Sequence, residues 1–408
     1  MAAARTKPRA LNFELSTHNR LGASPHQRER VLTARLKQFL DFRASNGTDF
    51  AFMRMICGVV LLAAGWFVLT PSYGDVSETT CAAAQKYSVS HRGLSLLVIQ
   101  DGHILYEGYS GGDSRDRVAS IFSGTKGFWC LAAIAAQQDG ILDLDEPVKD
   151  TITEWADKPD KKNITIRNLL SFTAGIEPVF ALHGRRIPDR NRYSIALRAV
   201  EPPGESFMYG PSELQIFSEV LRRKLLRRHL TPQEYLQRRI LSPLGIYGVD
   251  FREDTVGNPL LASGFKLSAR EWAQIGILIL NEGKYGHRQI VPSGMLDELF
   301  KGSHANPIFG MGFWLNRTAG DGASEVDVEK MLDIPWERQY WHHVCLCRDA
   351  PRDLIAAIGS GYQRVFVIPS MDLIIVRQGR DGPFSDATFL RIILGKETVH
   401  RSRLAVSG

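Results

Sequence analysis

The stretch Ile121–Ala136 reads IFSGTKGFWCLAAIAA, with a serine and a lysine three positions apart at the head of an apolar run. Its large apolar residues recur with helical spacing, and the pattern ends at Asp139-Gly140. Residues three apart on a helix share a face, so we expect Ser123 and Lys126 to lie side by side in the first turn of a long buried helix.

This arrangement suits nucleophilic catalysis. A helix N-terminus favours negative charge, and a desolvated lysine has a lowered pKa that lets it accept the serine proton. A second Ser-x-x-Lys pattern, Ser263 to Lys266, precedes a helix cap at Ser268, in a loop that would not hold the two side chains together. The sequence GYSGG at 108–112 matches a nucleophile elbow by letter, but no helix follows it, so we interpret Ser110 as a turn residue.

The flanking sequence predicts one sheet closed by both chain ends. Two β-rich runs, 94–100 and 103–109, are joined by Asp101-Gly102, a strong hairpin signal. Further strands are expected at 353–359, 364–368 and 373–378, followed by a final helix from Asp386. Helical spacing dominates between about 150 and 290, so the predicted fold is α/β (α+β): an antiparallel sheet flanked by helices, with an inserted, mostly helical subdomain.

The distribution of charge argues against a nucleic-acid partner. Residues 1–54 carry ten Lys/Arg and four Asp/Glu, an excess that equals the net charge of +6 of the whole chain. The remainder is neutral overall, without the basic surface that nucleic acid requires.

The N-terminal region resembles an export signal. Residues 53–74 combine Arg54, an apolar stretch from Met55 to Leu69, and small residues that predict cleavage after Gly74. A retained anchor through residues 50–70, and hence membrane attachment, is the alternative. Residues 1–52 are then either a basic N-terminal extension or the result of a mis-assigned start, and residues 75–408 form the predicted hydrolase domain in the periplasm or outside the cell.

The cysteines allow two interpretations. Cys81 could pair with Cys345 or Cys347 in an oxidising compartment, or all could be free buried thiols. The sequence HHVCLC at 342–347 has no structural zinc spacing, and strand alternation would place His343 with both cysteines on one face as ordinary packing. We therefore expect no metal.

A family resemblance covers most of the chain from about Gly93 to Gln378. It resembles the serine β-lactamase and penicillin-binding-protein superfamily, on the branch of class C β-lactamases, D-amino-acid-recognising peptidases, family VIII esterases and 6-aminohexanoate-dimer hydrolases. The stretches that carry it include LSLLVIQDGHILYEGY, SIFSGTKGFWCLAAIAAQQDGILDLDEPV, ITIRNLLSFTAGI, PPGESFMYGPSELQIF, LASGFKLSAREWAQIGILILNEG and GSGYQRVFVIPSMDLIIV.

The resemblance assigns roles to three motifs. Ser123 and Lys126 match the nucleophile and its base, and Tyr209 matches the tyrosine that relays the proton to the leaving group. The second motif ends in Pro211, where the family has asparagine, and the third has Ala357 in place of a strand cation. The glycine turn that remains, made of Gly359, Ser360 and Gly361, implies an oxyanion hole formed by the N–H groups of Ser360 and Ser123.

These features predict an exported serine hydrolase that forms an acyl-enzyme with small-molecule carboxylic esters or linear amides, without metal or organic cofactor. A β-lactamase or D,D-peptidase is one alternative, with a basic residue such as Arg364 replacing the missing cation. A catalytically inactive binding protein on the same fold is the other.

Overall fold

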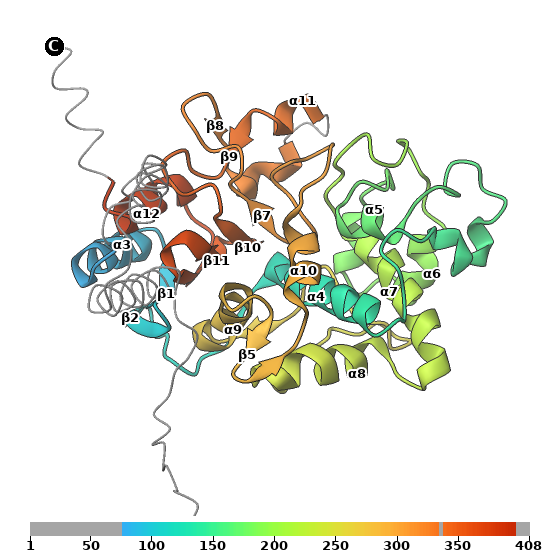
Figure 1. The fold of residues 1–408 in the computed structure, drawn as a ribbon, viewed down its shortest axis with the longest axis horizontal. Coiled ribbons are helices and arrows are strands. Elements are labelled where there is room, and N and C mark those ends of the chain that lie inside the picture. The colour runs from blue at the N-terminus through green and yellow to red at the C-terminus, as the bar shows by residue number, and fades with distance from the viewer. Residues whose placement is uncertain (1–75, 334–337, 397–408) are drawn as a thin grey trace, which may run out of the picture. The chain divides into compact units, whose positions relative to one another are not determined.

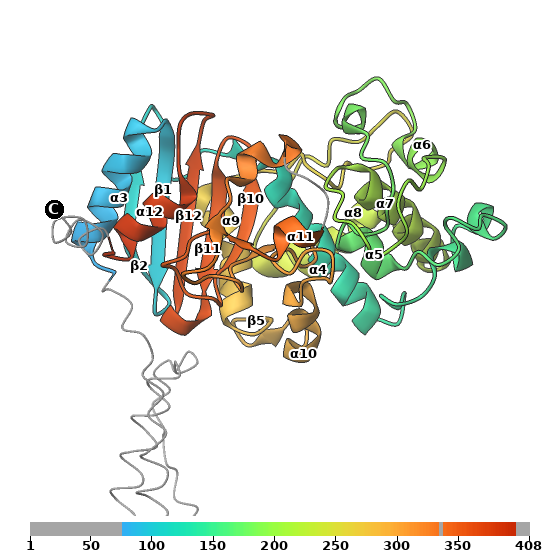
Figure 2. The same ribbon diagram turned by 90° about the horizontal axis from the view of Figure 1, so that it is seen from above.

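The central sheet joins the two ends of the described chain. A computed structural model describes residues 76–333 and 338–396. Its six-stranded antiparallel sheet has the order β2-β1-β12-β11-β10-β7, so a strand near the N-terminal end pairs with one near the C-terminal end (Figures 1 and 2). The strands are β1 Gly93–Gln100, β2 His103–Tyr109, β7 Trp314–Leu315, β10 Ile355–Gly359, β11 Gln363–Ile368 and β12 Leu373–Gly379. The predicted closure of one sheet by both chain ends is confirmed.

The β1–β2 hairpin forms at the predicted dipeptide. Asp101 and Gly102 both have positive φ, 50° and 76°, as the two central residues of a type I′ turn require. The remaining strands are short: β3 Ala119–Ser120, β4 Lys266–Leu267, β5 Lys284–Tyr285, β6 Arg288–Gln289, β8 Ser324–Glu325 and β9 Val344–Cys345. The strand predicted for 342–347 is wrong, because β9 spans two residues and all four from Val344 to Cys347 are buried, without alternation.

Helices supply the rest of the fold, and the last of them was predicted from Asp386. They are α3 Glu78–Ser90, α4 Thr125–Gln138, α5 Ile166–Leu170, α6 Arg190–Ile195, α7 Ser212–Leu225, α8 Pro232–Leu236, α9 Ala269–Leu280, α10 Ser293–Leu296, α11 Arg338–Trp341 and α12 Asp386–Ile393. The predicted capping box is present: Ser268 accepts the Glu271 N–H, and Glu271 accepts the Ser268 N–H.

Helices cover both faces of the sheet. Successive residues on a strand point to opposite faces of the sheet. Ile374 and Arg377 of β12 are an odd number of positions apart, so their side chains point to opposite faces. Ile374 contacts Gly276 of α9, whereas Arg377 donates a hydrogen bond to Ser88 of α3, which packs against α12. Because both faces are covered, β11 is buried along its whole length.

The helical region lies beside the sheet. Figure 2 shows α4 between the sheet and the group formed by α5, α6, α7 and α8. Helix α9 falls within the range 150–290 that we expected to be the insertion, yet it packs against β11 and β12. Within the range 150–290, the helices that do not pack on the sheet are therefore α5 to α8. Helix α4 lies between these helices and the sheet.

The predicted extension, export signal and anchor, residues 1–74, lie outside the described residues. Within the described part of the chain, no helix is long and apolar enough to cross a membrane.

Candidate active site

The candidate nucleophile occupies a tight turn in front of α4. Ser123 lies in the 3₁₀ turn Phe122–Gly124, which runs directly into α4, rather than in the first α-helical turn as predicted. Phe122 has φ 45°, in the left-handed region that bulky residues rarely adopt, and its side chain is exposed. A β-carbon at Gly124 would lie 2.4 Å from the Trp272 ring, so α9 packs closely against this turn.

Lys126 places its amine beside the serine in a dry environment. Its Nζ lies 2.7 Å from Ser123 Oγ and donates a second hydrogen bond to the Ala262 carbonyl at 2.8 Å. Residues 125–136 of α4 are all buried, so the helix is covered on every side and not only on the predicted face. Burial lowers the pKa of Lys126 to about 7, because the charged ammonium loses its solvation. A substantial fraction of the amine is therefore neutral near pH 7 and able to accept a proton.

Tyr209 completes the group from the segment that precedes α7. Its ring centroid lies 4.8 Å from Lys126 Nζ, and its hydroxyl interacts with the Ser123 side chain. Burial raises the pKa of Tyr209, although the contact with Ser123 opposes this shift. The phenol is therefore protonated at neutral pH, as a group that delivers a proton must be.

The segment that carries Tyr209 is anchored through a buried carboxyl group that the sequence did not reveal. Glu213 of α7 accepts hydrogen bonds from the N–H groups of Ala174 and Ile176, and Met208 donates its N–H to Phe172 O at 2.9 Å. Burial raises the pKa of Glu213 well above its ordinary value, while these backbone bonds oppose the shift.

The end of β10 meets the serine turn. A β-carbon at Gly359 would lie 2.0 Å from the Ile121 carbonyl oxygen, so only glycine fits this approach. Ser360 follows at the surface, and no described residue accepts a hydrogen bond from its N–H. The structure thus brings Gly359, the first residue of the sequence-predicted turn Gly359–Gly361, against the turn that carries Ser123.

The third-motif position offers no cation. Ala357 is two residues before Gly359 and therefore on the same face of β10, where it is buried. Arg364, the alternative cation, is fully buried: it binds both carboxylate oxygens of Asp386 at 2.8 and 2.9 Å and reaches Glu329 at 3.1 Å. Its charge is already balanced inside the protein, so Arg364 does not replace the strand lysine.

The structure adds a histidine that the sequence pattern did not single out. His183 Nδ1 lies 3.1 Å from Ser263 Oγ, next to the Ala262 carbonyl that binds Lys126. Burial, together with the charges of Lys126 and Arg252, lowers the pKa of His183 to about 4. Lys266, the partner of Ser263 in the second Ser-x-x-Lys pattern, is exposed on β4.

Ser110 is a structural residue, as expected. It follows β2 directly and donates a hydrogen bond to the Gly93 carbonyl at 2.6 Å. Its hydroxyl closes the end of the β1–β2 hairpin.

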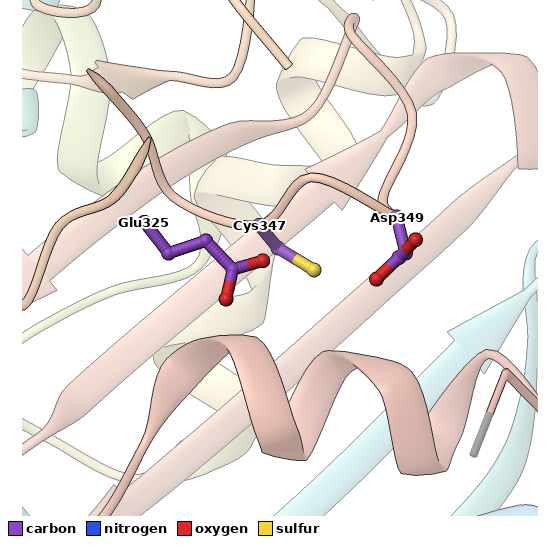
Figure 3. Close-up of side chains that lie close together, drawn as sticks. All are labelled: Glu325, Cys347 and Asp349. Carbon is purple, nitrogen blue, oxygen red and sulfur yellow. The ribbon is translucent and has the colours of Figure 1, made fainter. Parts of the chain in front are cut away.

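The four cysteines of the described chain are free and buried, so the disulfide alternatives for Cys81 are wrong. Figure 3 shows Cys347 between Glu325 and Asp349, with possible ligand atoms within 4.8 Å of one another. Arg391 donates to both carboxylates, and burial raises the pKa of the Cys347 thiol to about 12. We interpret the cluster as an ion-pair site that fixes α12.

The pH dependence of turnover follows from the Lys126 pKa. We expect kcat/KM for a neutral ester to rise with pH along a limb with an apparent pKa of about 7, because only the neutral amine accepts the serine proton. A His183→Gln variant should retain this limb, since His183 is already neutral above about pH 4. A flat profile between pH 5.5 and 8.5 in the wild type would contradict the assignment of Lys126.

The contact of Gly359 with Ile121 predicts a second effect. Gly359→Ala should lower kcat by about 100-fold, the scale of losing one oxyanion donor, because the added carbon pushes β10 away from the serine turn. Gly294→Ala is the matched control, since its β-carbon would enter open space at α10. Wild-type kcat in Gly359→Ala would show that the approach of β10 is unimportant.

Comparison with known proteins agrees with this geometry. The family model described as Beta-lactamase matches residues 80–377. Protein flp of Staphylococcus aureus (strain COL) is 26% identical over 194 residues, which are 43% of this chain and 38% of that protein, so the chain matches well under half of this curated relative.

Two solved structures share the fold. A putative beta-lactamase from Bacteroides dorei DSM 17855 superposes with a TM-score of 0.60 at 18% identity, over 80% of this chain and 98% of that one. A family VIII carboxylesterase superposes with a TM-score of 0.55 at 16% identity, over 80% of this chain and 98% of that one. With its family model spanning most of its length, the chain belongs to the beta-lactamase family of hydrolases.

Proposed function

We propose that this protein is an exported serine hydrolase that cleaves carboxylic esters or linear amides through an acyl-enzyme on Ser123. The observation that carries the proposal is the contact of Ser123 Oγ with the buried Lys126 amine, 2.7 Å away, whose pKa burial lowers to about 7. A buried lysine next to a hydroxyl is costly to a fold, and activation of a nucleophile is the function that this arrangement serves. Export rests on the apolar run within residues 53–74.

The proposed reaction has two halves. Neutral Lys126 takes the proton of Ser123, whose oxygen attacks the substrate carbonyl, while the N–H groups of Ser123 and Ser360 bind the oxyanion. Protonated Tyr209 then donates its proton to the leaving alcohol or amine and recovers one from Lys126. In the second half, water attacks the acyl carbonyl and gives a proton to neutral Lys126, and this proton passes to Ser123 Oγ as its bond to the acyl group breaks and the carboxylic acid leaves.

The preference for uncharged substrates is supported by what surrounds Ser123. Proline at 211 has no side-chain hydrogen-bond donor, Ala357 carries no charge, and Arg364 is held by Asp386 and Glu329. A substrate carboxylate would therefore find none of the contacts that the family's second and third motifs supply. The fold shared with a family VIII carboxylesterase is consistent with ester hydrolysis.

The specificity is tested by comparing two chromogenic substrates. We expect kcat/KM for p-nitrophenyl acetate to exceed that for nitrocefin, a carboxylated β-lactam, by about 100-fold. Each charge-assisted hydrogen bond that is missing in the transition state costs roughly 1.5 to 3 kcal/mol, or about one to two orders of magnitude. The intrinsic reactivity of p-nitrophenyl acetate contributes part of this difference in kcat/KM.

The variant Ala357→Lys separates specificity from intrinsic reactivity. Adding a cation at this buried position should move the ratio toward nitrocefin, and a cooperative melting transition, even at a lower temperature, shows that the variant is folded. If the wild type prefers nitrocefin, the protein is a β-lactamase, and another cation recognises the carboxylate.

A further inference from the structure

The turn that carries Ser360 is held in an unusual backbone conformation. Gly361 and Tyr362, which link β10 to β11, have φ 72° and 55°, both in the left-handed region. Glycine adopts this conformation freely, but a tyrosine does so only at a cost in free energy. Such a turn persists when surrounding contacts hold it in place.

A carboxylate from a distant segment supplies these contacts. Glu329, in the 3₁₀ turn Val328–Asp333 between β8 and β9, accepts the N–H of Tyr362 at 2.8 Å and that of Gly361 at 3.3 Å. Both left-handed residues thus donate to a single side chain. Arg377 binds the Tyr362 carbonyl at 2.7 Å from the α3 side of the sheet.

The buried guanidinium of Arg364 connects this carboxylate to the end of β10, which precedes Ser360. Arg364 Nη1 reaches Glu329 at 3.1 Å and donates to the Gly359 carbonyl at 2.9 Å. The other side of the guanidinium forms two parallel hydrogen bonds with Asp386 of α12. Burial disfavours the charge of Arg364, but Asp386 and Glu329 hold its pKa above the ordinary value. The guanidinium of Arg364 is therefore charged and held in one position by these hydrogen bonds.

The orientation of one peptide group follows from the fixed position of this guanidinium. In a trans peptide the carbonyl and the N–H point in opposite directions, so the bond from Arg364 to Gly359 O directs the Ser360 N–H away from Arg364. That N–H has no acceptor among the described residues. A β-carbon at Gly359 would lie 2.0 Å from the Ile121 oxygen and 3.3 Å from the Gly124 nitrogen, so this peptide group follows a residue that packs against the turn carrying Ser123.

We propose that Glu329 and Arg364 are positioning residues that hold the Ser360 N–H in place as an oxyanion donor. Glu329 fixes the two residues after Ser360, and Arg364 fixes the peptide carbonyl before it. The inference rests on the proposed serine-hydrolase function, because the oxyanion is the group that this N–H would bind.

The experiment compares Glu329→Gln with Glu325→Gln in the full chain. Glu325 is a matched control, because it also accepts a backbone N–H, that of Arg348, and binds an arginine, Arg391, away from the turn. Three quantities are measured: kcat and KM for p-nitrophenyl acetate across the pH range, the inhibition constant of phenylboronic acid, and amide hydrogen exchange of the peptide that contains the turn.

For Glu329→Gln we expect a fall in kcat of about tenfold or more, with KM changed less than about threefold, since the oxyanion contact forms in the transition state. The inhibition constant of the boronic acid, which mimics the tetrahedral adduct, should rise to a similar extent. Exchange in the turn should accelerate. Glu325→Gln should match the wild type in all three measurements.

Wild-type kcat and boronate affinity in Glu329→Gln would overturn the inference. A shifted pH profile with unchanged boronate affinity would also overturn it, because Glu329 would then act through the charge that it presents to Tyr209. If the wild type hydrolyses neither esters nor linear amides, the proposed function fails, and the exchange measurement still decides whether Glu329 holds the turn.

Discussion

The burial of one lysine amine is the constraint on which the rest of this structure depends. Lys126 lies on α4, whose residues 125–136 are all buried in the protein interior. Its two hydrogen-bond partners are Ser123 and the Ala262 carbonyl. The pKa falls from 10.5 to about 7, so in the folded protein the ammonium form costs roughly 5 kcal/mol, at about 1.4 kcal/mol for each unit. The folded pKa is below the unfolded one, so this cost is complete below pH 7 and fades as the pH rises toward 10.5.

Burial of apolar side chains offsets the free-energy cost of burying this amine. Of two further polar side chains, that of Tyr209 contacts the amine and that of Arg364 contacts the end of β10. A tyrosine with raised pKa faces the lysine, so one group is ready to accept a proton while the other retains one. Arg364 balances its charge against Asp386 and Glu329 instead of meeting a substrate. The same cation that sequence reasoning offered as a substrate contact is instead buried and donates a hydrogen bond to the Gly359 carbonyl of β10.

Sequence reasoning placed the strands correctly, because β-rich runs and the Asp101-Gly102 turn are local signals, and strands at both ends of the chain then indicated that one sheet joins them. It also found the serine, the lysine and the tyrosine that the structure brings together. It could not find Glu329 or His183, whose partners lie 32 and 80 residues away in the sequence and share no local pattern with them. The alternation expected for 342–347 failed because β9 is short and tertiary packing buries both of its sides.

The most direct test of the central claim is to map the site of covalent labelling by a fluorophosphonate, using peptide mass analysis after a brief exposure at pH 8. We expect a single adduct on the peptide that contains Ser123 and no adduct in Lys126→Met, which should remain folded because a methionine is readily buried at this position. An adduct on Ser110 or Ser263, or equally fast labelling of Ser123 in Lys126→Met, would contradict the claim that the buried amine activates this serine.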